Sequence, residues 1–260
     1  MPELIPDYDF VVQQLKETLK TDPVLPFQQL EFRRDLTSSR EQLKLSVQRW
    51  LDLCSEAGIA CAGRNTTYTK GSRNAEYHFF VCASKKTANL VHWNMRQLSG
   101  MSGLRFALGI RPDHWELRAL VRTNIPEVAI PDAIIHLTPR KLLPKYPRRS
   151  WVNAGMPFFN DIAVEWDSGS AVRADLVTKI CNYAQVAQYQ LWVAATIKRA
   201  ETLLEVCYEV LPDANKKIGV IALDWRTGQC LGHCLPARGT PFLDLLESTM
   251  QEVQIPWSKH

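Results

Sequence analysis

The expected fold follows from three consecutive segments: NDIAVEWDSGS at residues 160–170, RADLVTKICNYAQVA at 173–187 and YQLWVAAT at 189–196. The first and third segments are short and rich in β-branched and aromatic residues, which is typical of strands. The middle segment has the apolar spacing of a helix. A strand, a helix and a second strand in this order predict a sheet with helices on its faces.

The same kind of pattern continues on both sides of this stretch. On its N-terminal side, IPDAIIHLT at 130–138 is strand-like and WELRALVR at 115–122 is helix-like. On its C-terminal side, residues 198–211 predict a helix, and two apolar segments around Arg226-Thr227-Gly228 predict a β-hairpin. Residues 114–260 are therefore expected to form an α/β (α+β) domain with a mixed sheet.

The N-terminal part of the chain, residues 1–84, predicts a winged helix-turn-helix domain. Helices are expected at 8–20 and 26–34, and a longer third helix follows. IACAG and AEYHFFVCA, on either side of a polar turn at 65–74, predict a hairpin of two strands. Three helices followed by a basic hairpin is the order of a winged helix, whose recognition helix enters the major groove of DNA.

The third helix is expected to begin near Thr37, Ser38 or Ser39, with Glu41 near the reciprocal capping position, and to end at Gly58. Its expected apolar stripe consists of Leu43, Val47, Trp50, Leu51 and Cys54. Residues 85–113 are expected to be a helical connector that the GMSG run at 100–103 interrupts.

Basic residues gather in three places that could contact DNA. Arg40, Lys44 and Arg49 fall on the third helix, and Arg64, Lys70 and Arg73 fall in or beside the hairpin. The loop RKLLPKYPRRSW at 140–151 contributes Arg140, Lys141, Lys145, Arg148 and Arg149 beside two aromatic residues. Such side chains suit the phosphate backbone and bases of DNA. The alternatives are a solvated loop and a winged helix that binds protein.

Acidic residues at the ends of the expected strands are the candidate catalytic group. Asp132 begins one strand and Glu165 lies late in the next, so the two carboxylates can converge on a divalent cation. Magnesium prefers such oxygen ligands. Glu116, on the segment before the first strand, and Asp167 are further candidates. The alternative is that these acids cap loops or pair with arginines.

The composition excludes several classes of protein. Hydrophobic residues make up 46% of the 260 residues and charged residues 22%, which excludes a disordered chain, a collagen-like chain and a coiled coil. No apolar run reaches the ~18 residues of a membrane span, and no secretory signal is expected.

The seven cysteines are interpreted as free thiols of a cytoplasmic protein. Zinc is not expected at Cys230, His233 and Cys234, which form the best metal-like cluster.

The ordered series IPDAII, AVEWDSGS, TKICNYAQVA, LWVAAT and KRAETLLEV resembles the replication-relaxation proteins of plasmids and other mobile elements. The resemblance implies a winged helix joined to a domain similar to the PD-(D/E)xK nuclease fold. The matching positions are Pro131-Asp132, Glu165-Trp166-Asp167, Gly169-Ser170, and Lys179 with Tyr183. The chain departs from the nuclease motif at its last position, because Asp167 stands where the lysine is expected and Lys179 would have to replace that lysine.

Two functions remain open from the sequence. In one, Asp132 and Glu165 hold magnesium, Glu116 or Asp167 assists, and Lys179 lies near the scissile phosphate of double-stranded DNA. In the other, the protein is a non-catalytic DNA-binding or assembly factor, or a transcriptional regulator, whose sheet docks other proteins of the same mobile element. The process would be replication, mobilisation or transposition.

Overall fold

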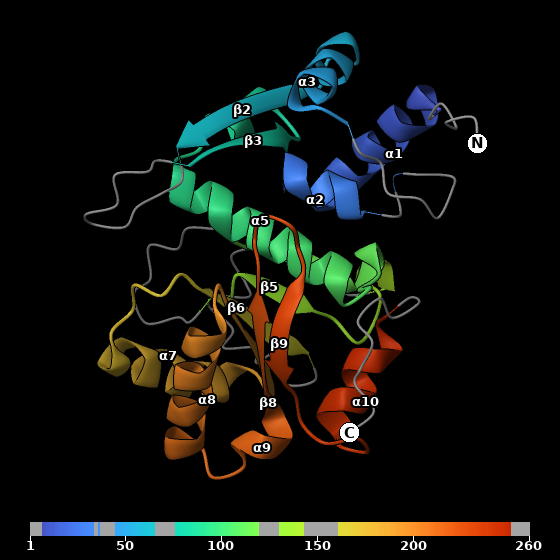
Figure 1. Ribbon diagram of the computed structural model, residues 1–260. Coiled ribbons are helices and arrows are strands. Elements are labelled where there is room, and N and C mark those ends of the chain that lie inside the picture. Colours follow the sequence, from blue (N-terminus) through green and yellow to red (C-terminus); the bar gives the residue numbers. More distant parts are fainter. Residues whose placement is uncertain are drawn as a thin grey trace, which may run out of the picture. The chain divides into compact units, whose positions relative to one another are not determined.

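The computed structural model describes residues 7–33, 36, 45–65, 76–119, 130–142 and 161–250. It has a mixed α/β architecture with one three-stranded and one six-stranded sheet (Figure 1). The chain divides into two compact units. The first consists of Met1–Phe106 with Trp225–Gly228, and the second of Ala107–Asp224 with Gln229–His260.

The second unit is organised around the six-stranded sheet, whose strands follow one another in chain order. The first three strands are antiparallel, the next two run parallel to the third, and the last strand is antiparallel again. The strands are β4 (Trp115–Leu117), β5 (Ala133–Ile135), β6 (Ile162–Asp167), β7 (Tyr189–Ala194), β8 (Ile218–Leu223) and β9 (Cys230–Cys234).

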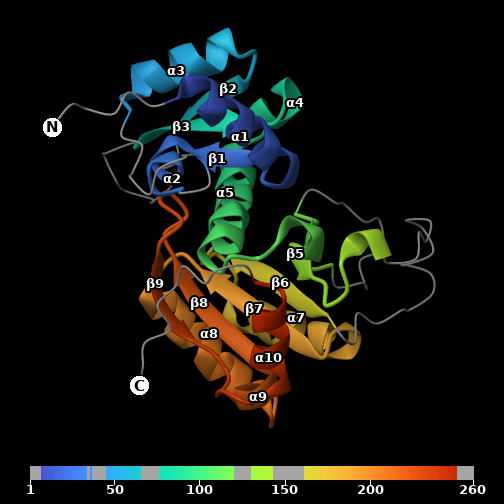
Figure 2. The same ribbon diagram turned by 90° about the vertical axis from the view of Figure 1, so that its right-hand side faces the viewer.

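Helices cover both faces of this sheet, as Figures 1 and 2 show. On one face, α7 (Arg173–Val186) and α8 (Ile197–Val210) pack Ile180 and Leu203 against Trp192 and Val220 of the strands. On the other face lies α10 (Pro241–Ser248), where a Cβ added to Gly219 would meet Phe242. Every residue of β6, β7 and β8 is buried, as expected for strands that are covered on both sides.

In the described part of the first unit, the helices α1, α2 and α3 alternate with the strands of the smaller sheet in the chain order α1, β1, α2, α3, β2, β3, and α4 and α5 follow. The sheet is antiparallel with strand order β1-β3-β2. Leu15 of α1, Leu30 of α2 and Trp50 of α3 share one core with Leu25 and Val81 of the strands. The elements are α1 (Tyr8–Thr21), β1 (Val24–Pro26), α2 (Phe27–Phe32), α3 (Val47–Glu56), β2 (Ala60–Asn65), β3 (Tyr77–Cys82), α4 (Lys85–Ala88) and α5 (His92–Ala107).

A buried ion cluster joins three elements of the first unit. The Asp22 carboxylate, which follows α1, accepts hydrogen bonds from Arg33 at 3.1 Å and from Arg105 at 2.8 and 2.6 Å. All three side chains are at most 9% exposed. Because an unpaired charge is costly in such a place, the cluster fixes the ends of α1 and α2 against α5.

Two predicted elements are wrong. The segment from Trp115 begins as the strand β4 and not as a helix, because Trp115–Leu117 pairs with β5. Residues 120–122 of that prediction lie outside the described part of the chain. The GMSG run does not interrupt a helix, because α5 continues through it. Its apolar side chains at 95, 98, 101 and 104 are buried at helical spacing, which offsets the ~1 kcal/mol that each glycine costs in a helix.

The third helix begins later than the sequence predicts. In the structure α3 starts at Val47, and the Ser46 hydroxyl caps it by accepting a hydrogen bond from the main-chain N–H of Arg49 at 3.2 Å. Leu45 and Ser46 are not helical, and the predicted caps at 37–39 lie outside the described residues. Val47 is 44% exposed, so its place in the apolar stripe is wrong, whereas Trp50 is buried as predicted.

Candidate active site

The pairing of β5 with β6 places the two candidate acids next to each other. Ala133 is opposite Val164, and one further step along the antiparallel register brings Asp132 beside Glu165. Side chains alternate between the faces of a strand, so Asp167 lies on the same face as Glu165. That face is the one covered by α7 and α8, because Glu165 is the register partner of Trp192.

Both carboxylates are held by donors of the protein. Lys179 of α7 donates to Oε1 of Glu165, and the Tyr183 hydroxyl lies 2.7 Å from Oε2. The same hydroxyl lies 2.9 Å from the carbonyl oxygen of Ile130. Asp132 accepts a hydrogen bond from the main-chain N–H of Trp166 through Oδ2 at 2.9 Å. The positions 179 and 183 are one helical turn apart, so α7 presents both side chains to Glu165.

The electrostatics of this group are dominated by burial. The Glu165 side chain is only 6% exposed, and burial together with the charge of Asp132 raises its pKa to about 7, although Lys179 and Tyr183 act in the opposite direction. Burial also opposes the charge of Lys179, but Glu165 outweighs it and raises the pKa of the ammonium. The side chain of Lys179 is 50% exposed. The site therefore combines a buried carboxylate pair with a cation that reaches solvent.

Asp167 is engaged in a different ion pair. Arg199, near the start of α8, donates to Oδ2 through Nε and to Oδ1 at 3.2 Å. The same guanidinium donates to the carbonyl oxygen of Ala171 at 2.8 Å, and the main-chain N–H of Gly169 donates to Oδ1 of Asp167. The hydrogen bond to Asp167 raises the pKa of Arg199. Asp167 thus ties the turn after β6 to α8.

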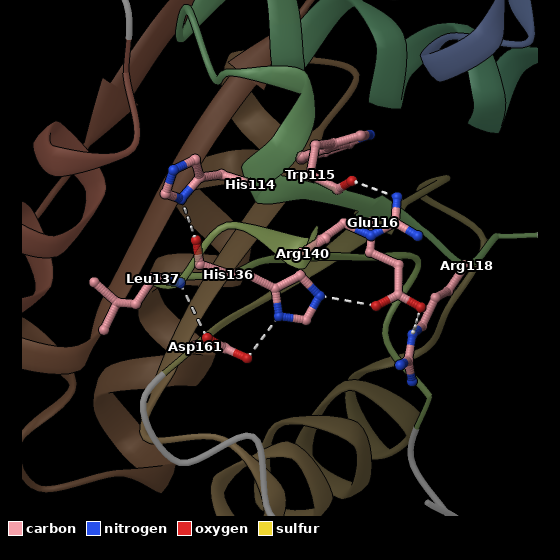
Figure 3. Close-up of polar contacts among 8 residues, drawn as sticks. All are labelled: His114, Trp115, Glu116, Arg118, His136, Leu137, Arg140 and Asp161. Carbon is pink, nitrogen blue, oxygen red and sulfur yellow. Dashed lines mark hydrogen bonds and ion pairs between the residues drawn. The ribbon is translucent and has the colours of Figure 1, made fainter. Parts of the chain in front are cut away.

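Glu116 belongs to a second polar cluster, shown in Figure 3. His136 is fully buried between two carboxylates and contacts Oε2 of Glu116 through Nε2 and Oδ2 of Asp161 through Nδ1, both at 2.8 Å. Glu116 also accepts from Nε of Arg118 at 3.1 Å. The register, in which Ile134 is opposite both Glu116 and Ala163, puts this cluster on the same face of the sheet as Glu165 but nearer the start of β6.

The second cluster stabilises charged forms of its members. Burial disfavours the imidazolium, but the hydrogen bonds to Asp161 and Glu116 outweigh burial and raise the pKa of His136. Burial also opposes the charge of Glu116, yet His136 and Arg118 lower its pKa to about 2. The cluster is therefore an ion network of His136 between two carboxylates, with Arg118 on its outer side.

Main-chain contacts hold this network in place. The main-chain N–H of Leu137 donates to Oδ1 of Asp161 at 3.1 Å. His114 donates through Nδ1 to the carbonyl oxygen of His136 at 2.6 Å, and Arg140 donates to the carbonyl oxygen of Trp115 at 3.2 Å (Figure 3). These contacts fix β4 and β5 against the start of β6 and leave Glu116 outside the Asp132–Glu165 group.

Four of the predicted DNA-binding residues lie in described parts of the chain. Arg49 lies with its guanidinium 4.6 Å from the centre of the Tyr8 ring. Arg64 donates to the carbonyl oxygens of Gly63, Ala88 and Leu90, so its guanidinium fixes α4 and the turn after it. Arg140 and Lys141 are exposed in a short 3-10 turn, Arg140–Leu142. The remaining ones lie outside the described residues: Arg40, Lys44, Lys70, Arg73, Lys145, Arg148 and Arg149.

The sequence analysis did not identify four residues of these polar groups, namely Arg118, His136, Asp161 and Arg199. His136 follows an apolar run, and a lone histidine at the end of such a run is the signal that could have marked it. No local pattern marks Asp161 or Arg199, because their partners are 25 and 32 residues away.

Comparisons with family models, with curated proteins and with solved structures find no match for this chain. Within the described residues, no group of three or more His, Cys, Asp and Glu side chains is placed to hold a metal ion. The same part of the chain contains no helix with the length and apolar character needed to cross a membrane.

Proposed function

We propose that the chain is a DNA-binding protein of a mobile genetic element, with a metal-dependent nuclease centre at Asp132, Glu165 and Lys179. The observation that carries the proposal is the ion pair between Lys179 and Glu165. It brings a half-exposed ammonium to a buried carboxylate that has a second carboxylate beside it. Lys179 can thereby supply the positive charge that Asp167 cannot supply from the strand.

The chemistry of the two carboxylates fits a divalent cation. Asp132 and Glu165 offer oxygen atoms of the kind magnesium prefers, and burial and repulsion between the two charges raise the pKa of Glu165 to about 7. A cation near both groups would relieve that repulsion. Magnesium, when bound, would supply a Lewis acid and a more acidic water for phosphodiester hydrolysis.

The residues around these carboxylates have separate tasks in the proposed site. Tyr183 and the main-chain N–H of Trp166 orient Glu165 and Asp132. Lys179, whose side chain reaches solvent, binds a phosphate oxygen and stabilises negative charge that develops on it. Asp167 orients the turn before α7 through Arg199 and does not contact the phosphate.

The test is cleavage of supercoiled and linear DNA with magnesium or manganese. Wild type is compared with Asp132→Asn, Glu165→Gln and Lys179→Met, and with Glu205→Gln as a control, since Glu205 is an exposed residue of α8. We expect the first two variants to lose cleavage and Lys179→Met to lose at least ~100-fold, as when a charge-stabilising donor is removed. Cleavage that persists in Glu165→Gln would overturn the proposed centre.

The DNA-binding part of the proposal rests on the first unit. Its three helices precede a two-stranded hairpin, which is the order of a winged helix, and Arg49 lies on the third helix. We expect duplex binding to weaken with salt, and the quadruple variant of Arg40, Lys44, Lys70 and Arg73 to alanine to flatten that dependence by about one slope unit per lost phosphate contact. Lys217→Ala, on α9 (Ala214–Lys217), is the control. Equal slopes for both variants would contradict this placement.

A second candidate function is favoured by the internal contacts of the acids. Asp132, Glu165 and Asp167 each accept hydrogen bonds from groups of the protein, which is the arrangement of a structural polar network. In this case the protein is a non-catalytic DNA-binding or assembly factor that uses the sheet to dock partner proteins. Salt-dependent DNA binding without cleavage, equal in wild type and Glu165→Gln, would favour it.

A further inference from the structure

Two cysteines of the first unit are packed against each other. Cys54 lies in the last turns of α3 and is 1% exposed, and Cys61 lies on β2, half-buried against the same core. Each of the two thiols shifts the pKa of the other. Both are free cysteines in the structure.

The chain reversal after α3 creates this contact. Gly58 has a φ of +67°, which a glycine adopts without strain, and the main-chain N–H of Ile59 donates to the carbonyl oxygen of Cys54 at 2.7 Å. The following strand therefore returns along the end of the helix. Cys61 is the register partner of Val81, and Val81 belongs to the core that contains Cys54. The two sulfurs thus lie on the helix-covered face of the sheet.

A third cysteine lies close by but on the opposite face. Cys82 is the register partner of Ala60, one position before Cys61, so its side chain alternates to the other side of the sheet. Cys54 is therefore the better-placed partner for Cys61.

The two thiols differ in reactivity. The interaction with Cys54 lowers the pKa of Cys61, although burial acts against this, so Cys61 is the more readily ionised thiol of the pair. The same interaction, and then burial, raises the pKa of Cys54, so that thiol keeps its proton. Cys61 is also more accessible than Cys54, which is 1% exposed. A half-buried thiol of lowered pKa beside a second thiol is the arrangement of redox-sensing cysteines.

We propose that Cys54 and Cys61 form a peroxide-sensitive dithiol in which Cys61 is oxidised first and Cys54 closes a disulfide. The Cys61 thiolate attacks one oxygen of hydrogen peroxide, becomes a sulfenic acid and releases hydroxide. The sulfur of Cys54 then attacks the sulfur of Cys61, and the hydroxyl group leaves with the Cys54 proton as water. The released hydroxide takes up the proton that Cys61 lost when it ionised, so in total two thiols lose two electrons and two protons to one peroxide, which becomes two waters. The inference does not depend on the proposed function, because it concerns the core of the first unit alone.

The sequence permits a direct test by mass spectrometry of the full chain. Trypsin releases residues 50–64 as one peptide that contains both cysteines, whereas Cys82 falls in a separate peptide, residues 74–85. The folded protein is treated with equimolar hydrogen peroxide, denatured with N-ethylmaleimide and digested. We expect the chain to lose two of its seven thiols, and the 50–64 peptide to appear unlabelled and lighter by two hydrogen atoms.

Variants separate the two steps. Cys61→Ala should abolish the disulfide, whereas Cys54→Ala should leave a sulfenic acid on Cys61 that dimedone traps. Cys207→Ala, which removes a buried thiol of α8, is the control and should behave as wild type. The proposal is overturned if the wild-type 50–64 peptide carries two maleimide labels after peroxide treatment. A disulfide between the 50–64 and 74–85 peptides would also overturn it, because Cys82 would then be the partner. The wild-type measurement decides the matter even if a cysteine variant fails to fold.

Discussion

Lys179 on α7 donates a hydrogen bond to Glu165 on β6, fourteen residues earlier in the chain. The residue that follows Glu165 on the same face of the strand is Asp167, which binds Arg199 and not Lys179. A helix thus brings to the buried carboxylate the cation that the strand does not carry. The charge of Glu165 is balanced only in part, because its pKa stays raised at about 7.

Replacing Glu165 by glutamine should stabilise the protein above neutral pH. The pKa of the Glu165 carboxyl group is about 7 in the folded protein and 4.5 in the unfolded chain. This carboxyl group therefore lowers the free energy of unfolding as the pH rises from 4.5 through 7. Glu165→Gln keeps the shape without the charge, so we expect a gain of roughly 1–3 kcal/mol at pH 8 and little change at pH 5. Urea unfolding of both proteins at pH 5 and pH 8 measures these differences in stability. Glu205→Gln should show no such pH dependence, and a pH-independent difference between Glu165→Gln and wild type would refute the expectation.

Replacing His136 by glutamine should destabilise the second unit, most strongly at mildly acidic pH. The raised pKa of His136 gives stability that is fully present below pH 6.5 and is lost as the pH rises through the folded pKa. The lowered pKa of Glu116 gives stability that is present above pH 4.5 and is lost as the pH falls through about 2. We expect His136→Gln to lower the free energy of unfolding by about 3–5 kcal/mol at pH 6, because it removes a buried partner of two carboxylates, and by less at pH 9.

Denaturant unfolding of His136→Gln across this pH range is the measurement, with exposed His233→Gln as the matched control. If His136→Gln cost the same at pH 6 and pH 9, His136 would not be the protonated centre of the network.

Replacing Asp22 by asparagine should strongly destabilise the first unit. The substitution removes the carboxylate charge that buried Arg33 and Arg105 share. Loss of one partner from a buried ion cluster costs about 3–5 kcal/mol. Thermal and urea unfolding would show it. The exposed Lys20–Glu17 pair provides the control, because Glu17→Gln should cost less than about 1 kcal/mol. Similar costs for both variants would mean that the cluster contributes no more than a surface pair.

Substitution by alanine should destabilise the protein much more at Trp50 than at Val47, although both residues lie on α3. Trp50 is 1% exposed and packs near Phe27, so Trp50→Ala should cost about 3–5 kcal/mol. Val47 is 44% exposed, so Val47→Ala should stay within about 0.5 kcal/mol. Chemical denaturation of both variants tests this, and comparable losses would show that the start of α3 is more buried than described.

Much of the fold could be predicted because its central elements have strong local patterns. The strand–helix–strand–helix series from β6 to α8 lies within three residues of the predicted bounds. The predicted hairpin of β8 and β9 is confirmed by their antiparallel pairing. The three-residue strand β4 could not be predicted, since its strand conformation depends on pairing with β5, which is distant in the chain. The structure confirms a mixed α/β fold at this level.

The candidate site was predictable only in part, for a related reason. Strand order alone suggested that Asp132 and Glu165 are neighbours, because both lie at the ends of adjacent strands. The partners of Asp167 and Glu116 were not predictable, since Arg199 and His136 reach them through tertiary packing and not through any short motif. Only the structure therefore shows which carboxylates are paired with cations.

The alternation of side chains along β6 limits how this protein can change in evolution. Glu165 lies on the face covered by α7 and α8, while Val164 and Trp166 lie on the other face. Inserting or deleting one residue within the strand would exchange the two faces and send the acid to the wrong side of the sheet. The number of residues between the start of β6 and Glu165 therefore cannot change by one without moving the carboxylate away from Lys179.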